Sequence, residues 1–202
     1  MSHPTRSRRR LLIAAAALLL AGPALGGCAS GTSDAPGAAR SADDPLLTEH
    51  DLAGLDVSQV IDRLDALPVA ERPADLLASV RPDSLVLSDD AGRETRLPMP
   101  EDRVYVSVAP YREQTHECHF HSLTTCRGEL SGAGVRVTLV RSDGEVLVDE
   151  ERTTYDNGFT GLWVPRGIEA TLTIGYDGRS GTVPVSTTDA DDPTCLTTLR
   201  LT

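Results

Sequence analysis

The alternation of apolar and polar residues that begins at Val104 constrains the fold of this chain more than any other feature. Successive side chains of a β-strand point to opposite faces, so a period of two predicts strands with one buried face. The alternating segments are 104–108, 135–139, 145–148, 159–164, 171–174, 182–185 and 196–201. Turn signals separate them, and Asp156-Asn157-Gly158 is the strongest. Short strands at such regular spacing predict an antiparallel β-sandwich over residues 101–202.

The chain before this region has a helical pattern and is predicted to form a small N-terminal domain over residues 45–100. Its first helix carries apolar residues at helical spacing, with Asp56 or Ser58 as a candidate cap. The apolar positions are Val57, Ile61 and Leu64. The predicted fold class is therefore α+β, a small helical N-terminal part followed by the sandwich.

Two further elements are predicted between the first helix and the sandwich. A second helix begins near Pro73 and stops before Pro82, and a short hairpin follows over residues 84–98. The apolar face of this second helix is formed by Leu76, Leu77 and Val80. No chemistry is expected in this part of the chain.

Residues 1–27 have the pattern of a bacterial lipoprotein signal peptide. Basic residues precede an apolar run of eleven residues from Leu11 to Ala21, which is too short for a membrane span of roughly 20 residues. Leu25-Gly26-Gly27-Cys28 then resembles a lipobox, in which the Cys accepts the lipid. We expect cleavage before Cys28, acylation of Cys28, and an extracytoplasmic protein anchored in the periplasm or on the outer face of the cell membrane. Residues 28–44, rich in small residues and without periodicity, predict a flexible tether.

The charge of the chain excludes one large class of partner. The full chain carries 19 Lys and Arg, all of them Arg, against 30 acidic residues. Residues 1–27 contain Arg but no Asp or Glu, so their removal makes the protein still more acidic. Such a protein repels nucleic acid and anionic lipid, so no nucleic-acid partner is expected.

Residues 116–126 concentrate the side chains that bind late transition metals. Three of the five His and two of the four Cys lie in this segment, which begins His116-Glu117-Cys118-His119-Phe120-His121 and ends at Cys126. Imidazole and thiolate bind Cu, Zn and related metals, whereas carboxylates suit Mg, Ca and Mn. The segment is therefore the predicted metal site, and the simpler interpretation is a surface loop with one structural disulfide. Asp189, Asp191 and Asp192 lack the spacing of an EF-hand loop and predict a solvated turn.

Long stretches of this chain resemble one family, the CueP-type periplasmic copper-binding proteins. The similarity extends over roughly residues 45–202 and is strongest at 105–111, 115–118, 120–130, 155–165 and 191–198. The three key cysteines of the family fall on Cys118, Cys126 and Cys195. The resemblance implies Cu(I) binding, protection against copper stress, and copper supply to an extracytoplasmic copper-zinc superoxide dismutase. It also implies a two-domain subunit with the capacity to form a homodimer, and a binding protein rather than an enzyme.

The ligand chemistry agrees with this resemblance. Cu(I) is soft and prefers thiolate or thioether ligands, and Met99 is the only thioether beyond residue 27, so a Met-rich site is excluded. A trigonal site of Cys118, Cys126 and Cys195 suits Cu(I), with zinc as a second metal that such ligands accept. If residues 115–121 are extended, His116 shares a face with Cys118, whereas His119 and His121 lie on the other. His116 is the first candidate for an auxiliary ligand and His121 the second, while His119 has no counterpart in the family motif.

Two alternatives to a copper-binding function remain open, and both depend on the state of the thiols or on the sandwich itself. In an oxidising compartment two of the three thiols are expected to form a disulfide, which leaves one buried thiol and is compatible with metal binding after reduction. A thiol-based redox protein that reduces Cu(II) or exchanges disulfides is the main alternative, although no Cys-x-x-Cys pair is present. An inert sandwich that binds another protein is the second.

Overall fold

The computed structural model describes residues 44–202. The predicted signal peptide, Cys28 and almost all of the predicted tether lie outside the described residues. Among the residues described, no helix is long and apolar enough to cross a membrane. The helical elements are α2 (Pro45–Glu49), α3 (Val57–Asp65) and the 3-10 helix η1 (Val69–Glu71). The strands are β1 (Leu76–Val80), β2 (Ser84–Asp89), β3 (Glu94–Pro98), β4 (Arg103–Val108), β5 (Gly134–Arg141), β6 (Val146–Thr153), β7 (Thr160–Pro165), β8 (Glu169–Tyr176), β9 (Arg179–Ser186) and β10 (Cys195–Leu196).

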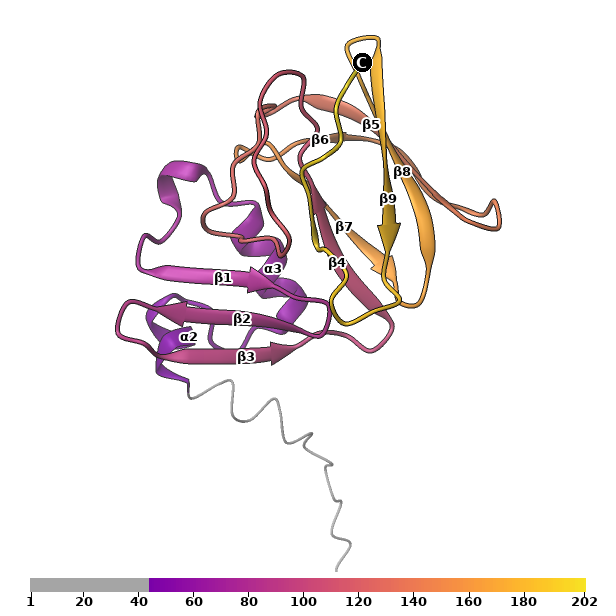
Figure 1. Cartoon of the computed structure of the whole chain (residues 1–202). Coiled ribbons are helices and arrows are strands. Elements are labelled where there is room, and N and C mark those ends of the chain that lie inside the picture. Colours follow the sequence, from indigo (N-terminus) through magenta and orange to yellow (C-terminus); the bar gives the residue numbers. More distant parts are fainter. Residues whose placement is uncertain (1–43) are drawn as a thin grey trace, which may run out of the picture. The chain divides into compact units, whose positions relative to one another are not determined.

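The predicted sandwich is confirmed in its sheets and its core. One sheet has the strand order β10-β4-β7 and the other β6-β5-β8-β9. Figure 1 labels all of these strands except β10. The alternating apolar residues of β4, β5 and β8 are buried together between the sheets, with Val108, Val137 and Leu172 fully inaccessible. The named strands of the two sheets pair antiparallel, except that β10 runs parallel to β4. This parallel pair is what brings the C-terminal Cys195 beside Ser107.

The first predicted helix is confirmed, and its start is capped as expected. The Asp56 side chain accepts from the Gln59 N–H at 2.9 Å, and the Gln59 side chain accepts from the Asp56 N–H at 2.9 Å. This reciprocal capping box makes Asp56, rather than Ser58, the cap of α3. The buried face of α3 carries Val60, Ile61 and Leu64 and also, at its end, Asp65.

The second predicted helix is wrong. Residues 76–80 form strand β1, which pairs antiparallel with β2, and the predicted 84–98 hairpin supplies β2 and β3 of this three-stranded sheet. Leu76, Ala78 and Val80 are buried, whereas Leu77 points outward and is 54% exposed. Leu76, Leu77 and Val80 fit a helix and a strand equally well in a segment this short, and pairing with β2 decides the outcome.

One hydrophobic core joins the N-terminal elements to the sandwich. The cluster beneath β1–β3 and α3 also contains Tyr105 from β4 and Leu123 from the connection between β4 and β5. The Tyr105 ring packs edge-on against Trp163 of β7, with centroids 5.0 Å apart. The division into domains at residues 45–100 and 101–202 therefore stays a prediction, since this core crosses the proposed boundary.

The long connection between β4 and β5, residues 109–133, is attached to the free edge of β1. The Val80 N–H donates to the His121 carbonyl at 2.8 Å, and the Leu123 N–H donates to the Ala78 carbonyl at 2.9 Å. Farther along, Gly128 and Gly158 meet so closely that a Cβ on Gly158 would lie 2.6 Å from the Gly128 oxygen. Gly158 also has a φ of +78°, so both space and backbone conformation require glycine there. The connection is thus fixed in the middle of its Cys-containing segment and just after it.

Candidate metal centre

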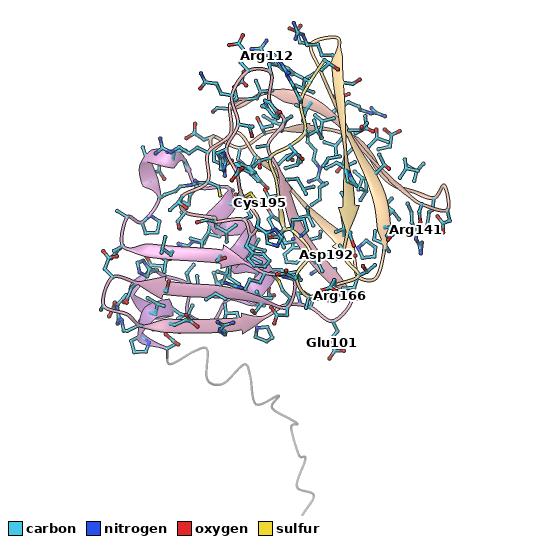
Figure 2. All side chains as sticks on the ribbon, viewed as in Figure 1. Glu101, Arg112, Arg141, Arg166, Asp192 and Cys195 are labelled. Atoms are coloured by element: carbon cyan, nitrogen blue, oxygen red, sulfur yellow. A yellow bond between two sulfur atoms is a disulfide. The ribbon has the colours of Figure 1, made fainter. Side chains whose placement is uncertain are left out.

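Four of the predicted ligands come together where the β4–β5 connection passes β10. The donor atoms of His116, Cys118, Cys126 and Cys195 all lie within 4.8 Å of one another. His116, Cys118 and Cys126 belong to the connection, whereas Cys195 is placed by the parallel pairing of β10 with β4. Cys195 is labelled in Figure 2 within the body of the fold, whereas Arg112 and Arg141 lie at its periphery. That these residues hold a metal stays a prediction.

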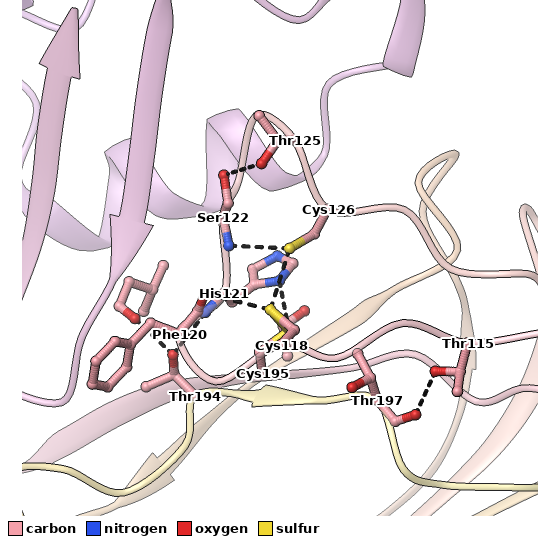
Figure 3. Close-up of a disulfide and its surroundings, with 12 residues drawn as sticks. Thr115, Cys118, Phe120, His121, Ser122, Thr125, Cys126, Thr194, Cys195 and Thr197 are labelled. Carbon is pink, nitrogen blue, oxygen red and sulfur yellow. Dashed lines mark hydrogen bonds between the residues drawn. A yellow bond between two sulfur atoms is a disulfide. The ribbon is translucent and has the colours of Figure 1, made fainter.

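The three sulfur atoms form one cluster, shown in Figure 3. Cys118 and Cys195 are joined by a disulfide with their Cα atoms 5.7 Å apart. Cys126 is a buried free thiol, and its Sγ lies 3.5 Å from the Sγ of Cys118. This is the oxidised state in which one disulfide leaves one thiol, and reduction places three thiols at the same point.

His116 has an environment that suits a metal ligand. Its Nε2 is buried and has no hydrogen-bond partner within the described chain. Burying an imidazole nitrogen without a partner is unfavourable, so such an atom usually marks a missing water, ion or metal. The segment 114–118 has no strand conformation, so a loop rather than strand alternation brings His116 and Cys118 to one side.

His121 lies next to the sulfur cluster but is not one of the four residues whose donor atoms come together. Its ring is fully buried, and its Nδ1 is 3.8 Å from the Sγ of Cys195. Its Nε2 is 3.0 Å from a carboxylate oxygen of Asp65. His119 turns away from the cluster, since its exposed ring contacts the Asp191 carbonyl at 2.8 Å. The structure thus groups His116 with all three sulfurs, places His121 against the sulfur of Cys195, and separates His119 from them.

Asp65 anchors a buried polar network that sequence reasoning did not identify. Its carboxylate accepts from the Tyr105 hydroxyl at 2.7 Å and the Asn157 amide at 2.8 Å, in addition to the contact with His121. Burial raises the pKa of Asp65, but the charge and hydrogen bond of His121, with the other donors, outweigh this and hold the pKa below its ordinary value. One signal was present in the sequence, because Asp65 falls four residues after Ile61 on the apolar face of α3.

The network gives the cluster a positive environment. Burial favours neutral His121, but the Asp65 carboxylate outweighs it and raises the pKa of His121 to about 9. Burial likewise raises the pKa of the Cys126 thiol, but the hydrogen bond and charge of His121, the Ser122 N–H and the charge of Arg72 bring it below its ordinary value. A low thiol pKa favours thiolate, which is the form that binds metal.

An open cavity gives access to the cluster from solvent. It has a volume of about 510 Å³, and its lining includes His116, Cys118, Phe120, Thr125, Cys126 and Arg127. Cys195 is only 3% exposed and is not among the residues that line this cavity. The arrangement is a largely buried sulfur cluster with Cys118 and Cys126 lining an open cavity, which suits capture of a soft ion.

Comparisons with known proteins agree with this chemistry. Residues 59–200 match the family model described as periplasmic copper-binding protein CueP. A solved structure, "Crystal Structure of S.CueP", superimposes with a TM-score of 0.72 at 38% sequence identity, covering 77% of this chain and 94% of that one. A search among curated proteins found no significant match.

Proposed function

The chain belongs to the CueP family of periplasmic copper-binding proteins, and we propose that it holds one Cu(I) through Cys118, Cys126 and Cys195. The observation that carries this proposal is the convergence of three sulfurs and the partnerless His116 Nε2 within 4.8 Å. Cu(I) prefers soft ligands in low coordination, so three thiolates with His116 as an auxiliary ligand suit it better than any carboxylate site. Zinc is a second metal that this donor set accepts.

Reduction precedes binding in this proposal. The Cys118–Cys195 disulfide removes two of the three thiolates, and only Cys126 is then available as a sulfur ligand. Two electrons and two protons from an external thiol reductant regenerate both thiols. Copper loading is therefore expected only for protein that has been reduced and kept free of oxygen.

A metal competition tests the class of ligand. Anaerobically reduced protein is expected to bind close to one Cu(I), and a large excess of Mg²⁺ or Ca²⁺ should leave that copper in place, because hard cations prefer oxygen ligands. Copper and zinc content is measured after gel filtration with and without the competing ions. Displacement of copper by Ca²⁺ would mean that carboxylates hold it, and oxidised protein provides the control with a single thiol.

We place this copper site outside the cytoplasm, near the membrane. The support is the lipobox-like Leu25-Gly26-Gly27-Cys28 after an apolar run, together with the periplasmic character of the family. From this position the protein supplies copper to a copper-zinc superoxide dismutase or a similar cuproenzyme. The homodimer implied by the family resemblance stays a prediction.

Lipid anchoring predicts a simple change of partition. The full chain is expected in the detergent phase after Triton X-114 separation, and Cys28→Ala should move it to the aqueous phase, because the acylated Cys is lost. Cys126→Ala, made in the same chain, is the matched control and should partition as the parent does. Unchanged partition of Cys28→Ala would refute the anchor.

The thiol geometry favours one alternative, a redox protein. Cys126 Sγ lies 3.5 Å from Cys118 Sγ, which is close enough for a thiolate to attack the Cys118–Cys195 disulfide. In the reduced protein, oxidation of two thiols to a disulfide would reduce two Cu(II) to two Cu(I). Incubation with excess Cu(II) separates the two functions: a binding protein forms Cu(I) once, whereas a redox protein forms it repeatedly when a thiol reductant is supplied.

A further inference from the structure

We propose that Arg72, which lies between η1 and β1, is a positioning residue of the copper site that holds Cys126 in place and supplies a permanent positive charge beside the sulfurs. This inference rests on the proposed function, and it adds a residue from the N-terminal elements to a site otherwise built from the connection and β10. Arg72 follows Glu71 and precedes Pro73, in a part of the chain where no chemistry was expected.

The Arg72 side chain is enclosed and contacts the site directly. Its guanidinium is 3% exposed, and Nη1 donates to the Cys126 carbonyl at 2.8 Å. Its backbone is fixed independently, because the Val69 N–H at the start of η1 donates to the Asp156 carboxylate at 2.7 Å. Asp156 belongs to the turn before β7, so Arg72 reaches Cys126 from a segment tied to the sandwich.

The charge of Arg72 is incompletely compensated in the metal-free protein. Among residues 44–202, Asp65 is the one carboxylate within ion-pair distance, at 4.0 Å from Nη2, and that carboxylate already accepts from His121, Tyr105 and Asn157. Nε and Nη2 have no hydrogen-bond partner in the described chain. A buried cation with two partnerless nitrogens is unfavourable, so a purely structural role would be better served by an apolar side chain.

The thiolates that hold the copper supply the missing negative charge. A Cu(I) ion held by three thiolates leaves two net negative charges in a buried place, and opposite charges attract strongly where water is excluded. A guanidinium stays protonated in proteins, so its charge does not depend on the state of the thiols. Arg72 is therefore expected to stabilise the copper-loaded state more than the empty one.

The experiment compares Arg72→Gln and Arg72→Lys with a matched arginine remote from copper. Arg166 is the control, since it is part-buried and donates to the carbonyls of Pro82 and Pro100 without contacting the cluster. Arg72→Gln should weaken Cu(I) binding roughly 10- to 100-fold, the range seen for partners that orient metal ligands. Arg72→Lys should lose less, because it keeps the charge. Arg166→Gln should lose stability in urea and keep the parent's affinity.

The number of sulfur atoms bound to copper separates positioning from general stability. X-ray absorption of the copper-loaded parent and of Arg166→Gln should show three sulfurs, and Arg72→Gln fewer, because Cys126 is no longer held. Parental affinity and sulfur count in Arg72→Gln would overturn the inference. If Arg72→Gln does not fold, Arg72→Lys decides: a measurable loss of affinity supports the inference, and parental affinity overturns it. Failure of the parent itself to bind Cu(I) would instead refute the proposed function, and this inference with it.

Discussion

Serine in place of Cys195 is expected to remove most of the Cu(I) affinity of the reduced protein, by more than about 100-fold, which exceeds the usual effect of losing an outer ligand partner. A serine hydroxyl is a hard, neutral donor and does not replace a thiolate for Cu(I). Cys118 and Cys126 would remain 3.5 Å apart at their sulfurs and would have to recruit His116 to complete the coordination. Anaerobic competition against a chromophoric Cu(I) chelator measures the loss.

Variants of the other ligands rank the contribution of each ligand to Cu(I) affinity. Cys118→Ser and Cys126→Ser are expected to lose as much as Cys195→Ser, whereas His116→Ala should lose less than any of them, because it is an auxiliary donor. Thr125→Ser, at the rim of the same cavity, is the matched control and should bind as the parent does. Parental affinity in Cys195→Ser would replace the three-sulfur site by a two-sulfur site with His.

Alanine in place of Asp65 is expected to lower the free energy of unfolding by about 3–5 kcal/mol, the cost of removing one partner from a buried charged group. The substitution leaves His121 and Arg72 without their carboxylate and deprives the buried Tyr105 hydroxyl and Asn157 amide of an acceptor. Urea unfolding of the reduced, metal-free proteins measures the change. Asp65→Asn should lose less, because it keeps an acceptor of the same shape.

Asp62, three residues earlier on α3, provides the control. Its carboxylate is exposed and accepts from the Trp163 indole at 3.0 Å. Asp62→Ala should therefore cost about 1 kcal/mol or less, as expected for one solvent-accessible hydrogen bond. Equal effects of the two substitutions would show that the Asp65 network does not stabilise the fold.

The sandwich was predictable because each strand has its own alternating pattern of apolar and polar residues, and turn residues separate the strands. Val104, Val106 and Val108 predict one buried face of a strand. The turn at Tyr176-Asp177-Gly178 joins β8 to β9, and Asp177 and Gly178 have the positive φ values that such a tight turn needs. By contrast, residues 76–80 carry apolar side chains that fit either periodicity, and only the partner strand β2 selects β1. Local pattern alone was therefore insufficient there.

The sequence indicated the sulfurs of the candidate site but not what surrounds them. The clustering of His and Cys predicted a metal site at residues 116–126, and the family resemblance predicted that Cys195 belongs to it. The pairing of Cys118 with Cys195 was open, because three thiols permit three disulfides. Arg72 and Cys126 are 54 residues apart in the sequence. A contact between residues so far apart produces no local sequence pattern from which it could be predicted. Asp65 was detectable only as a carboxylate on an apolar helical face.

The parallel pairing of β10 with β4 has a consequence for the order of assembly. Cys195 lies 77 residues after Cys118 and is carried by the last strand of the sheet, so the third sulfur is added only when the C-terminal segment docks. Contacts of such long range form late, since the intervening loop must close first. A partly folded chain therefore holds at most two of the three sulfurs in place. The sulfur cluster is therefore complete only when the fold is complete, and at the proposed copper site coordination by all three sulfurs is expected only of fully folded molecules.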